Sequence, residues 1–215
     1  MPLSFDGAGT ITGLQVGGLP DGIVDTDMLA TDAVSAAKLQ STAIASSDLP
    51  AGSILQVKTT IYDTFTSESC TANANNELNF NVTITPASSS NKIIISSSIM
   101  GQWNSTNNHN SMYTVNRKIG ATNNYLSPSS DVSSRNRGLV VGGSMLEADT
   151  GSSHCQYSIA NYLDSPNTTS EITYIPTIRI GTNAMTWYYN QNASAGDNGN
   201  YERGVSWITV MEVAA

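Results

Sequence analysis

Charged residues are scarce in this sequence of 215 residues. Lys, Arg, Asp and Glu make up 12% of it, and 9 basic residues face 17 acidic ones, which gives a formal net charge of −8. A nucleic-acid-binding surface needs clustered Lys and Arg side chains to neutralise phosphates. The pair Arg135 and Arg137 is too small for that purpose. The composition therefore argues against nucleic acid as a partner.

Histidine and cysteine are also rare, with two residues of each. His154 and Cys155 are neighbours, and adjacent residues of a strand point to opposite faces, so they are a poor Cys/His catalytic pair. The signatures of zinc proteases, dithiol redox proteins, serine hydrolases and nucleotide-binding loops are missing. Cys70 and Cys155 could form one disulfide bridge, but buried, free thiols are the favoured interpretation. We expect no enzyme, no cofactor and no metal; a glycan depolymerase is the disfavoured alternative.

Long apolar runs are missing as well. No segment approaches the roughly 20 apolar residues of a membrane-spanning helix. The N-terminal run MPLSFDGAGTITG lacks the basic and apolar regions of a signal peptide. These absences predict synthesis in a cytoplasm and no membrane insertion.

What the sequence does have is an aliphatic residue at every fifth position over a long stretch. The positions are Leu14, Leu19, Val24, Leu29, Val34, Leu39, Ile44, Leu49 and Ile54. Five residues turn through about 500° on an α-helix, so no single helical face collects them. Five is also odd, so a continuous strand would send alternate positions to opposite faces. We interpret residues 14–52 as an oligomerising shaft in which copies of the chain wind around a common, threefold axis. The alternative is a flexible linker.

This repeat also carries a resemblance. The run GLPDGIVDTDMLATDAVSAAKLQ, followed by DLPAGSILQV and a β-rich region, resembles the N-terminal and shaft part of bacteriophage tail fibres and related virion appendages, notably in phages of aquatic bacteria. The resemblance covers about a quarter of the chain. It concerns the pattern of the repeat and not a residue-specific motif. The resemblance implies a homotrimeric virion fibre, made in the host bacterial cytoplasm and bound to other virion proteins of the tail or capsid.

Residues 1–13 precede the repeat and show no sustained period. They contain Gly7, Gly9 and Gly13. Such a segment is flexible by itself and can become ordered on a partner. We interpret it as the segment that attaches the fibre to the particle.

From residue 53 onward the pattern changes to short alternating runs separated by turns rich in Asn, Ser and Gly. The expected strands are SILQVKTTIY, ELNFNVTITP, KIIISSSIMG, SMYTVNRKIG, RGLVVGGSML, HCQYSIANYL, EITYIPTIRI, AMTWYYN and VSWITVMEV. This spacing predicts that residues 53–215 form an antiparallel β-sandwich of jelly-roll type.

Three of these runs predict which side chains are buried. In the first, Leu55, Val57, Thr59 and Ile61 are expected on the core side; in the second, Leu78, Phe80, Val82 and Ile84. In KIIISSSIMG, Ile94 lies on one face and Ile93, Ile95 and Ile99 lie on the other. Apolar residues on both faces indicate a strand between the core and a neighbouring subunit, so trimerisation is expected to continue through the head.

Two segments combine aromatic and amide side chains, QWNSTNNHNSMY and WYYNQNASAGDNGNY. Aromatic rings stack on the C–H bonds of sugars, and amides pair with sugar hydroxyls. The candidate glycan-binding residues are Trp103, Asn107, His109, Trp187, Tyr188 and Asn190. The alternative is that the Trp residues fill the core and the Asn-rich loops are ordinary connections. In an extended segment Trp187 and Tyr189 share a face, so one of Trp187 and Tyr188 must point away from the core. We expect the two segments to meet at the end of the head far from the shaft.

Two functions are consistent with these features. One is a short tail fibre that attaches the phage to a host-surface glycan through its C-terminal head. The other is a head fibre or capsid decoration without a specific receptor. The sequence does not separate them.

Overall fold

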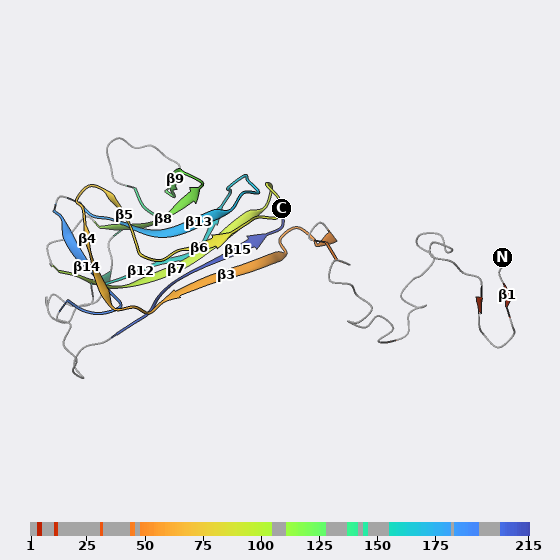
Figure 1. The fold of residues 1–215 in the computed structure, drawn as a ribbon, viewed down its shortest axis with the longest axis horizontal. Coiled ribbons are helices and arrows are strands. Elements are labelled where there is room, and N and C mark those ends of the chain that lie inside the picture. The colour runs from red at the N-terminus through yellow and green to blue at the C-terminus, as the bar shows by residue number, and fades with distance from the viewer. Residues whose placement is uncertain are drawn as a thin grey trace. The chain divides into compact units, whose positions relative to one another are not determined.

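The computed structural model describes residues 4–5, 11–12, 31, 44–45, 48–104, 111–127, 137–141, 144–145, 155–181, 183–193 and 203–215. The chain divides into two compact units, residues 1–45 and 46–215. In the first unit β1 (Ser4–Phe5) pairs antiparallel with β2 (Ile11–Thr12), an element that the sequence pattern does not predict (Figure 1). The repeat positions Leu14, Leu19, Val24, Leu29, Val34 and Leu39 lie outside the described residues. The shaft therefore stays a prediction.

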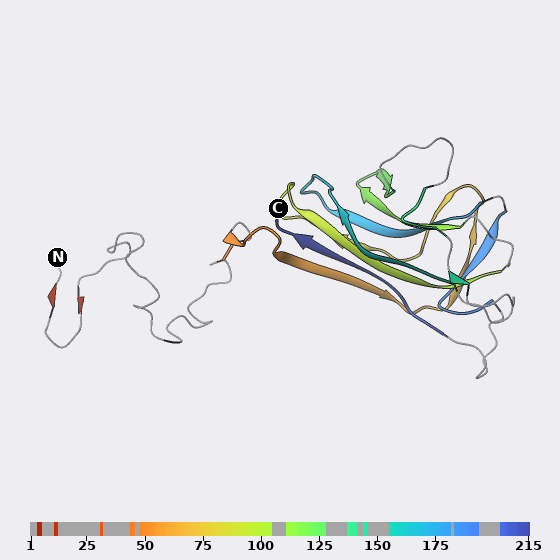
Figure 2. The same ribbon diagram turned by 180° about the vertical axis from the view of Figure 1, so that it is seen from behind.

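The second unit contains two curled antiparallel sheets, one of seven strands and one of six (Figures 1 and 2). The first sheet contains β3 (Ile54–Tyr62), β4 (Thr66–Cys70), β7 (Lys92–Trp103), β11 (Ser144–Met145), β12 (Cys155–Asp164), β14 (Met185–Tyr189) and β15 (Ser206–Val213). The second contains β5 (Asn75–Glu77), β6 (Val82–Ile84), β8 (Met112–Ile119), β9 (Thr122–Tyr125), β10 (Val140–Val141) and β13 (Ile172–Arg179). The described residues include no α-helix. The predicted β-rich, antiparallel class is confirmed.

Strand β7 is the centre of the seven-stranded sheet. It pairs with β12 along one side, while on its other side β15 pairs with residues 92–98 and β14 with residues 101–103. β3 lies beyond β15, and β4 lies beyond β14. In the six-stranded sheet β13 is central, with β8 on one side and both β5 and β6 on the other. β8 also pairs with β9 and β10.

Alternating side chains of both sheets form one hydrophobic core. Ile93, Ile95 and Ile99 of β7 are buried in it, and Ile94 lies on the opposite face, as the sequence predicts. The predicted inward residues Leu78, Phe80, Val82 and Ile84 are buried as well. A run of alternating apolar residues identifies the two faces of a strand because successive side chains point in opposite directions.

The predicted buried face of β3 is wrong. Val57 and Ile61 are 54% and 67% exposed, whereas Gln56 and Tyr62, on the other face, point to the core side. Gln56 donates a hydrogen bond to Glu212, 2.6 Å, and the Tyr62 ring stacks on Phe80 with centroids 5.0 Å apart. β3 is an edge strand, so its inward side chains meet only the rim of the core and can be polar. Its apolar face is the outer one.

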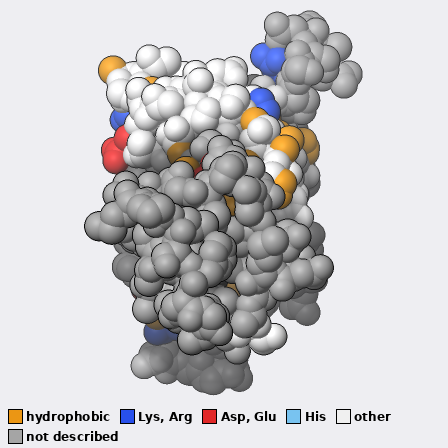
Figure 3. Space-filling model, turned by 90° about the vertical axis from the view of Figure 1, so that its right-hand side faces the viewer, with side chains coloured by type: hydrophobic (Ala, Val, Ile, Leu, Met, Phe, Trp, Pro, Cys, Tyr) orange, Lys and Arg blue, Asp and Glu red, His pale blue; other side chains and the backbone are white. Residues whose placement is uncertain are grey.

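Few charged side chains are visible on the face of the molecule that Figure 3 shows. Where described side chains are visible in Figure 3, Lys, Arg, Asp and Glu are few and hydrophobic side chains stand in small groups. Among the described residues, the exposed large hydrophobic ones are Ile44, Leu49, Ile54, Val57, Ile61, Phe65, Val141, Leu163 and Val205. The first three are positions of the five-residue repeat.

Candidate functional site

The described parts of the two aromatic segments lie next to each other, while residues 105–110 and 194–202 lie outside the described residues, so the meeting of the full loops stays a prediction. Trp187 of β14 lies opposite Trp103 of β7, and their rings make an edge-to-face contact with centroids 5.0 Å apart. Within residues 46–215 this pair lies at the end of the first sheet opposite to Ile54, where β14 and β4 are labelled in Figure 1.

Both Trp side chains are part of the core and offer no face to a sugar. Trp103 and Trp187 are buried. Trp103 Nε1 donates a hydrogen bond to Tyr157 Oη, 3.0 Å, and that hydroxyl also contacts Ser111 Oγ at 2.6 Å. Of the two interpretations of these residues, the one in which they fill the core agrees with the structure.

Tyr188 points away from the core, as the alternation requires. It is half-buried on the outer face of the sheet, opposite Gln102 of β7 and Ser67 of β4. Gln102 also lies on the outer face but is buried, and its Oε1 accepts a hydrogen bond of 2.6 Å from the backbone N–H of Ala193. Among the six candidate residues, Tyr188 is the one that the structure describes with a partly exposed side chain. Asn107 and His109 lie outside the described residues.

Asn190 is a buried structural residue rather than an exposed amide. Its Nδ2 donates to the carbonyls of Tyr62 and Thr64, at 2.8 and 3.1 Å, and its Oδ1 accepts from Ser206 Oγ at 2.7 Å. Its φ is +57°, a conformation that Asn tolerates better than most residues. The side chain thus joins the end of β3 to the start of β15. Sequence reasoning missed this role because the three partners are distant in the chain.

Tyr189, next to Asn190, is a buried hydrogen-bond donor. Its hydroxyl donates to Glu68 Oε2 and accepts a hydrogen bond of 3.3 Å from the N–H of Asn79. Burial raises the pKa of Tyr189 strongly, and the hydrogen bond to Glu68 raises it further. The phenol therefore stays neutral over the physiological pH range. It holds β4 and β14 to the segment after β5, and no role as a base follows.

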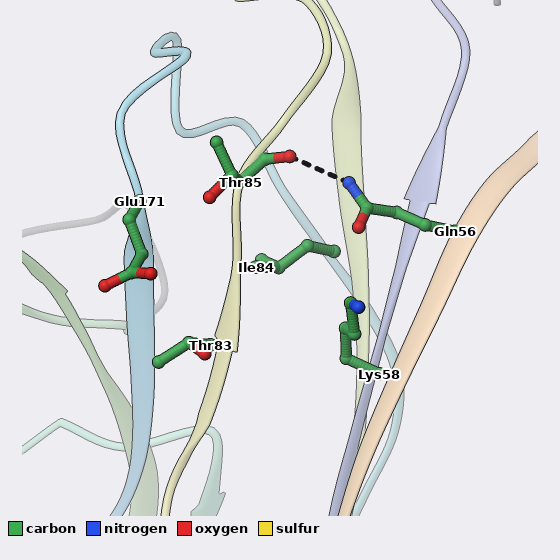
Figure 4. Close-up of a pocket in the computed structure, with 6 residues that line it drawn as sticks. All are labelled: Gln56, Lys58, Thr83, Ile84, Thr85 and Glu171. Atoms are coloured by element: carbon green, nitrogen blue, oxygen red, sulfur yellow. Dashed lines mark hydrogen bonds between the residues drawn. The ribbon is translucent and has the colours of Figure 1, made fainter.

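A surface pocket of about 300 Å³ opens where the edges of the two sheets approach each other (Figure 4). It is lined by Gln56, Lys58, Thr83, Ile84, Thr85 and Glu171. Lys58 and Glu171 stand on opposite walls in the figure, and Gln56 Nε2 donates a hydrogen bond of 2.8 Å to the carbonyl of Thr85. The pocket can hold a small polar molecule. No sequence signal indicates it, because its lining comes from three separate segments.

The titratable groups of the described residues offer no metal site, since no three of His, Cys, Asp and Glu lie close enough together to hold an ion. Cys70 and Cys155 are buried, free thiols. No helix in the described part of the chain is long and apolar enough to cross a membrane.

The chain matches no protein-family model and no curated protein. The repeat, the sheet faces and the surface residues are therefore the basis on which a function is proposed.

Proposed function

We propose that this chain is a structural fibre subunit of a bacteriophage virion, acting as a short tail fibre. In this proposal residues 1–13 bind the particle, residues 14–52 form the threefold shaft, and residues 53–215 form a head of jelly-roll type that contacts the host surface. No catalysis, cofactor or nucleic acid is involved.

One observation carries the proposal: aliphatic residues recur every five positions, and those that the structure describes are exposed in the single chain. Ile44, Leu49 and Ile54 are 59%, 38% and 48% exposed. Single exposed aliphatic residues are common, but a regular series of them marks a surface that a partner covers. Closed symmetric association of identical chains is the commonest way to cover such a series. A long, repeat-built, oligomeric segment attached to a β-rich unit is the organisation of a fibre.

In this proposal each head makes a weak contact with the host surface, and the contact is repeated in the three copies. The two sheets of the head enclose one hydrophobic core, and charged residues make up 12% of the chain. Tyr188 is partly exposed and can stack on a sugar ring. A single site of this kind is weak, and three copies acting together gain strength through effective concentration.

The alternative is a head fibre or capsid decoration that has no specific receptor. It is favoured by the burial of Trp103, Trp187 and Asn190, because half of the six predicted sugar-binding side chains are used inside the fold. It shares the shaft and the head with the tail-fibre proposal.

Antibody labelling of intact particles distinguishes the two. Antibodies raised against the head are applied to particles of the virus that encodes the chain, which are then viewed by electron microscopy. Label at the tail or baseplate is expected. Label on the capsid would support the decoration, and particles that contain none of the chain would refute both.

A further inference from the structure

The outer face of the seven-stranded sheet carries a continuous apolar row. Leu163 of β12 lies opposite Ile94 of β7, Ile94 lies opposite Met211 of β15, and Met211 lies opposite Val57 of β3. The four strands lie side by side in both ribbon views (Figures 1 and 2). Leu163 is 57% exposed, about as much as Val57. The row therefore crosses the sheet from one side to the other with both ends open to water.

A neighbouring pair extends this row. Trp207 of β15 is partly exposed and lies opposite Ile61 of β3, which is 67% exposed and is the most exposed of the large hydrophobic residues on these four strands. We call the six residues Val57, Ile61, Ile94, Leu163, Trp207 and Met211 the outer patch. Monomeric proteins rarely expose large contiguous apolar areas, so such a patch indicates a surface that is covered.

The outer face of the other sheet is different. Along its central strand β13 the outward side chains include Thr173, Thr177 and Arg179, and the paired strand β8 places Lys118 opposite Thr173. Ile175, the aliphatic residue among them, is buried and so adds little apolar surface. Val141 of β10, which is 73% exposed, is the exposed large hydrophobic residue among the described residues of this sheet. The six-stranded sheet therefore has no apolar row like the outer patch among its described residues.

The charges of the chain favour a second copy as the occupant. The chain carries a net charge of −8, so two copies repel each other wherever their carboxylates meet. On β3, β7, β12 and β15, all of which are fully described, the carboxylates Asp164 and Glu212 are buried, and the outward positions contain no acid. Lys92, at one end of β7, is the charge on this face. Identical chains can therefore meet here without bringing carboxylates together.

The repeat leads into the same sheet. Ile54 is its last position, it is the first residue of β3, and it lies opposite Val213 of β15. Val57 of the outer patch follows three residues later. If copies of the chain meet along the repeat up to Ile54, they are already in contact at the beginning of the strand that carries the patch.

We propose that the outer patch is a contact between heads, in which copies of this chain turn this sheet toward their common axis. The inference rests on the proposed trimer and deepens it, because it assigns the head its own assembly surface. The natural cysteines Cys70 and Cys155 are buried, so a cysteine placed in the patch can be followed by labelling.

The test uses the full chain with either Ile61→Cys or, as a control, Thr122→Cys. Thr122 is an exposed strand residue of the other sheet. The native mass should be that of three chains, and a maleimide should modify Ile61→Cys roughly tenfold more slowly than Thr122→Cys, because a covered side chain reacts only after local opening. In a second pair of variants, Ile61→Asp should weaken assembly on dilution while Thr122→Asp leaves it unchanged.

The outcomes separate this inference from the proposal on which it rests. An oligomeric chain in which both cysteines react equally fast would overturn the head contact and leave the repeat-based trimer standing. A monomeric wild-type chain would overturn both. Because the cysteine variants change one side chain conservatively, they report on the patch even if Ile61→Asp does not fold.

Discussion

Arg117 of β8 and Asp164 of β12 form an ion pair that joins the two sheets, with 2.6 Å between Arg117 Nη1 and Asp164 Oδ1. The second carboxylate oxygen accepts a hydrogen bond of 2.8 Å from the hydroxyl of Tyr174 on β13. Burial raises the pKa of Tyr174, and the charge of Asp164 raises it further, so the phenol remains a neutral donor. One buried carboxylate thus connects β12 to β8 and to β13, which belong to the other sheet.

Removing the carboxylate of Asp164 should lower the stability of the fold. Asp164→Ala leaves Arg117 largely buried without its partner, which should lower the free energy of unfolding by about 3–5 kcal/mol. Glu171→Ala, which removes an exposed carboxylate, should change it by less than about 0.5 kcal/mol. Urea unfolding at a fixed protein concentration measures both. Equal effects would show that the ion pair does not stabilise the fold.

Asn190 should behave as a structural residue. Asn190→Ala removes three side-chain hydrogen bonds, takes an acceptor from the buried hydroxyl of Ser206, and places Ala at a positive φ. Each unpaired buried group costs about 1–3 kcal/mol, so a drop in stability of at least about 2 kcal/mol is expected. Asn124→Ala, at an exposed position of β9, is the control. A thermal unfolding curve unchanged from the wild type would contradict the role assigned to Asn190.

The variant Tyr188→Ala distinguishes a receptor-binding tail fibre from a capsid decoration without a receptor. Because its side chain lies on the outer face, Tyr188→Ala should leave the core intact and lower stability by no more than about 1 kcal/mol. In the tail-fibre proposal, particles that carry this variant should adsorb to host cells more slowly. Adsorption is measured as the loss of free infectious particles from the culture supernatant. Unchanged adsorption, or a loss that follows unfolding, would favour the decoration.

The repeat aliphatics should stabilise the assembly. Each one buried in a symmetric shaft is worth roughly 1.5–3 kcal/mol per subunit, so Leu29→Asp and Leu39→Asp should both weaken association. Thr31→Asp, off the five-residue register and exposed, should be nearly silent. Light scattering over a dilution series follows the mass. If all three variants behave alike, the flexible-linker alternative gains support.

The two thiols should be unreactive in the folded chain. Burial raises the pKa of Cys70 to about 12 and that of Cys155 to about 11, from an ordinary value of 9.0. The thiols have lower pKa values in the unfolded chain than in the folded chain. Their contribution to the free energy of unfolding is therefore fully present below pH 9 and is lost as the pH rises through the folded pKa values of about 11 and 12. A thiol reagent at pH 8 should modify both cysteines only after denaturant is added. Rapid modification of the native chain would contradict this burial.

The sequence alone determined the β-rich class, the approximate position of most strands and the two faces of β7. These features depend on alternation between neighbouring residues, which the local chain fixes. Ile93 and Ile95 share a face and Ile94 takes the other for that reason alone. The same rule showed that Trp187 and Tyr188 point in opposite directions.

Only the tertiary structure decided which of two faces is covered and which side chains meet. Alternation in β3 is the same whether Val57 points in or out, and the register with β15, which places Val57 opposite the outward Met211, decided it. Trp103 and Asn190 carry side chains suited to sugars, yet partners from distant strands enclose them. The ion pair of Arg117 and Asp164 likewise depends on two strands in different sheets. Burial is a property of what packs against a residue, and for these positions the packing partners come from remote parts of the chain.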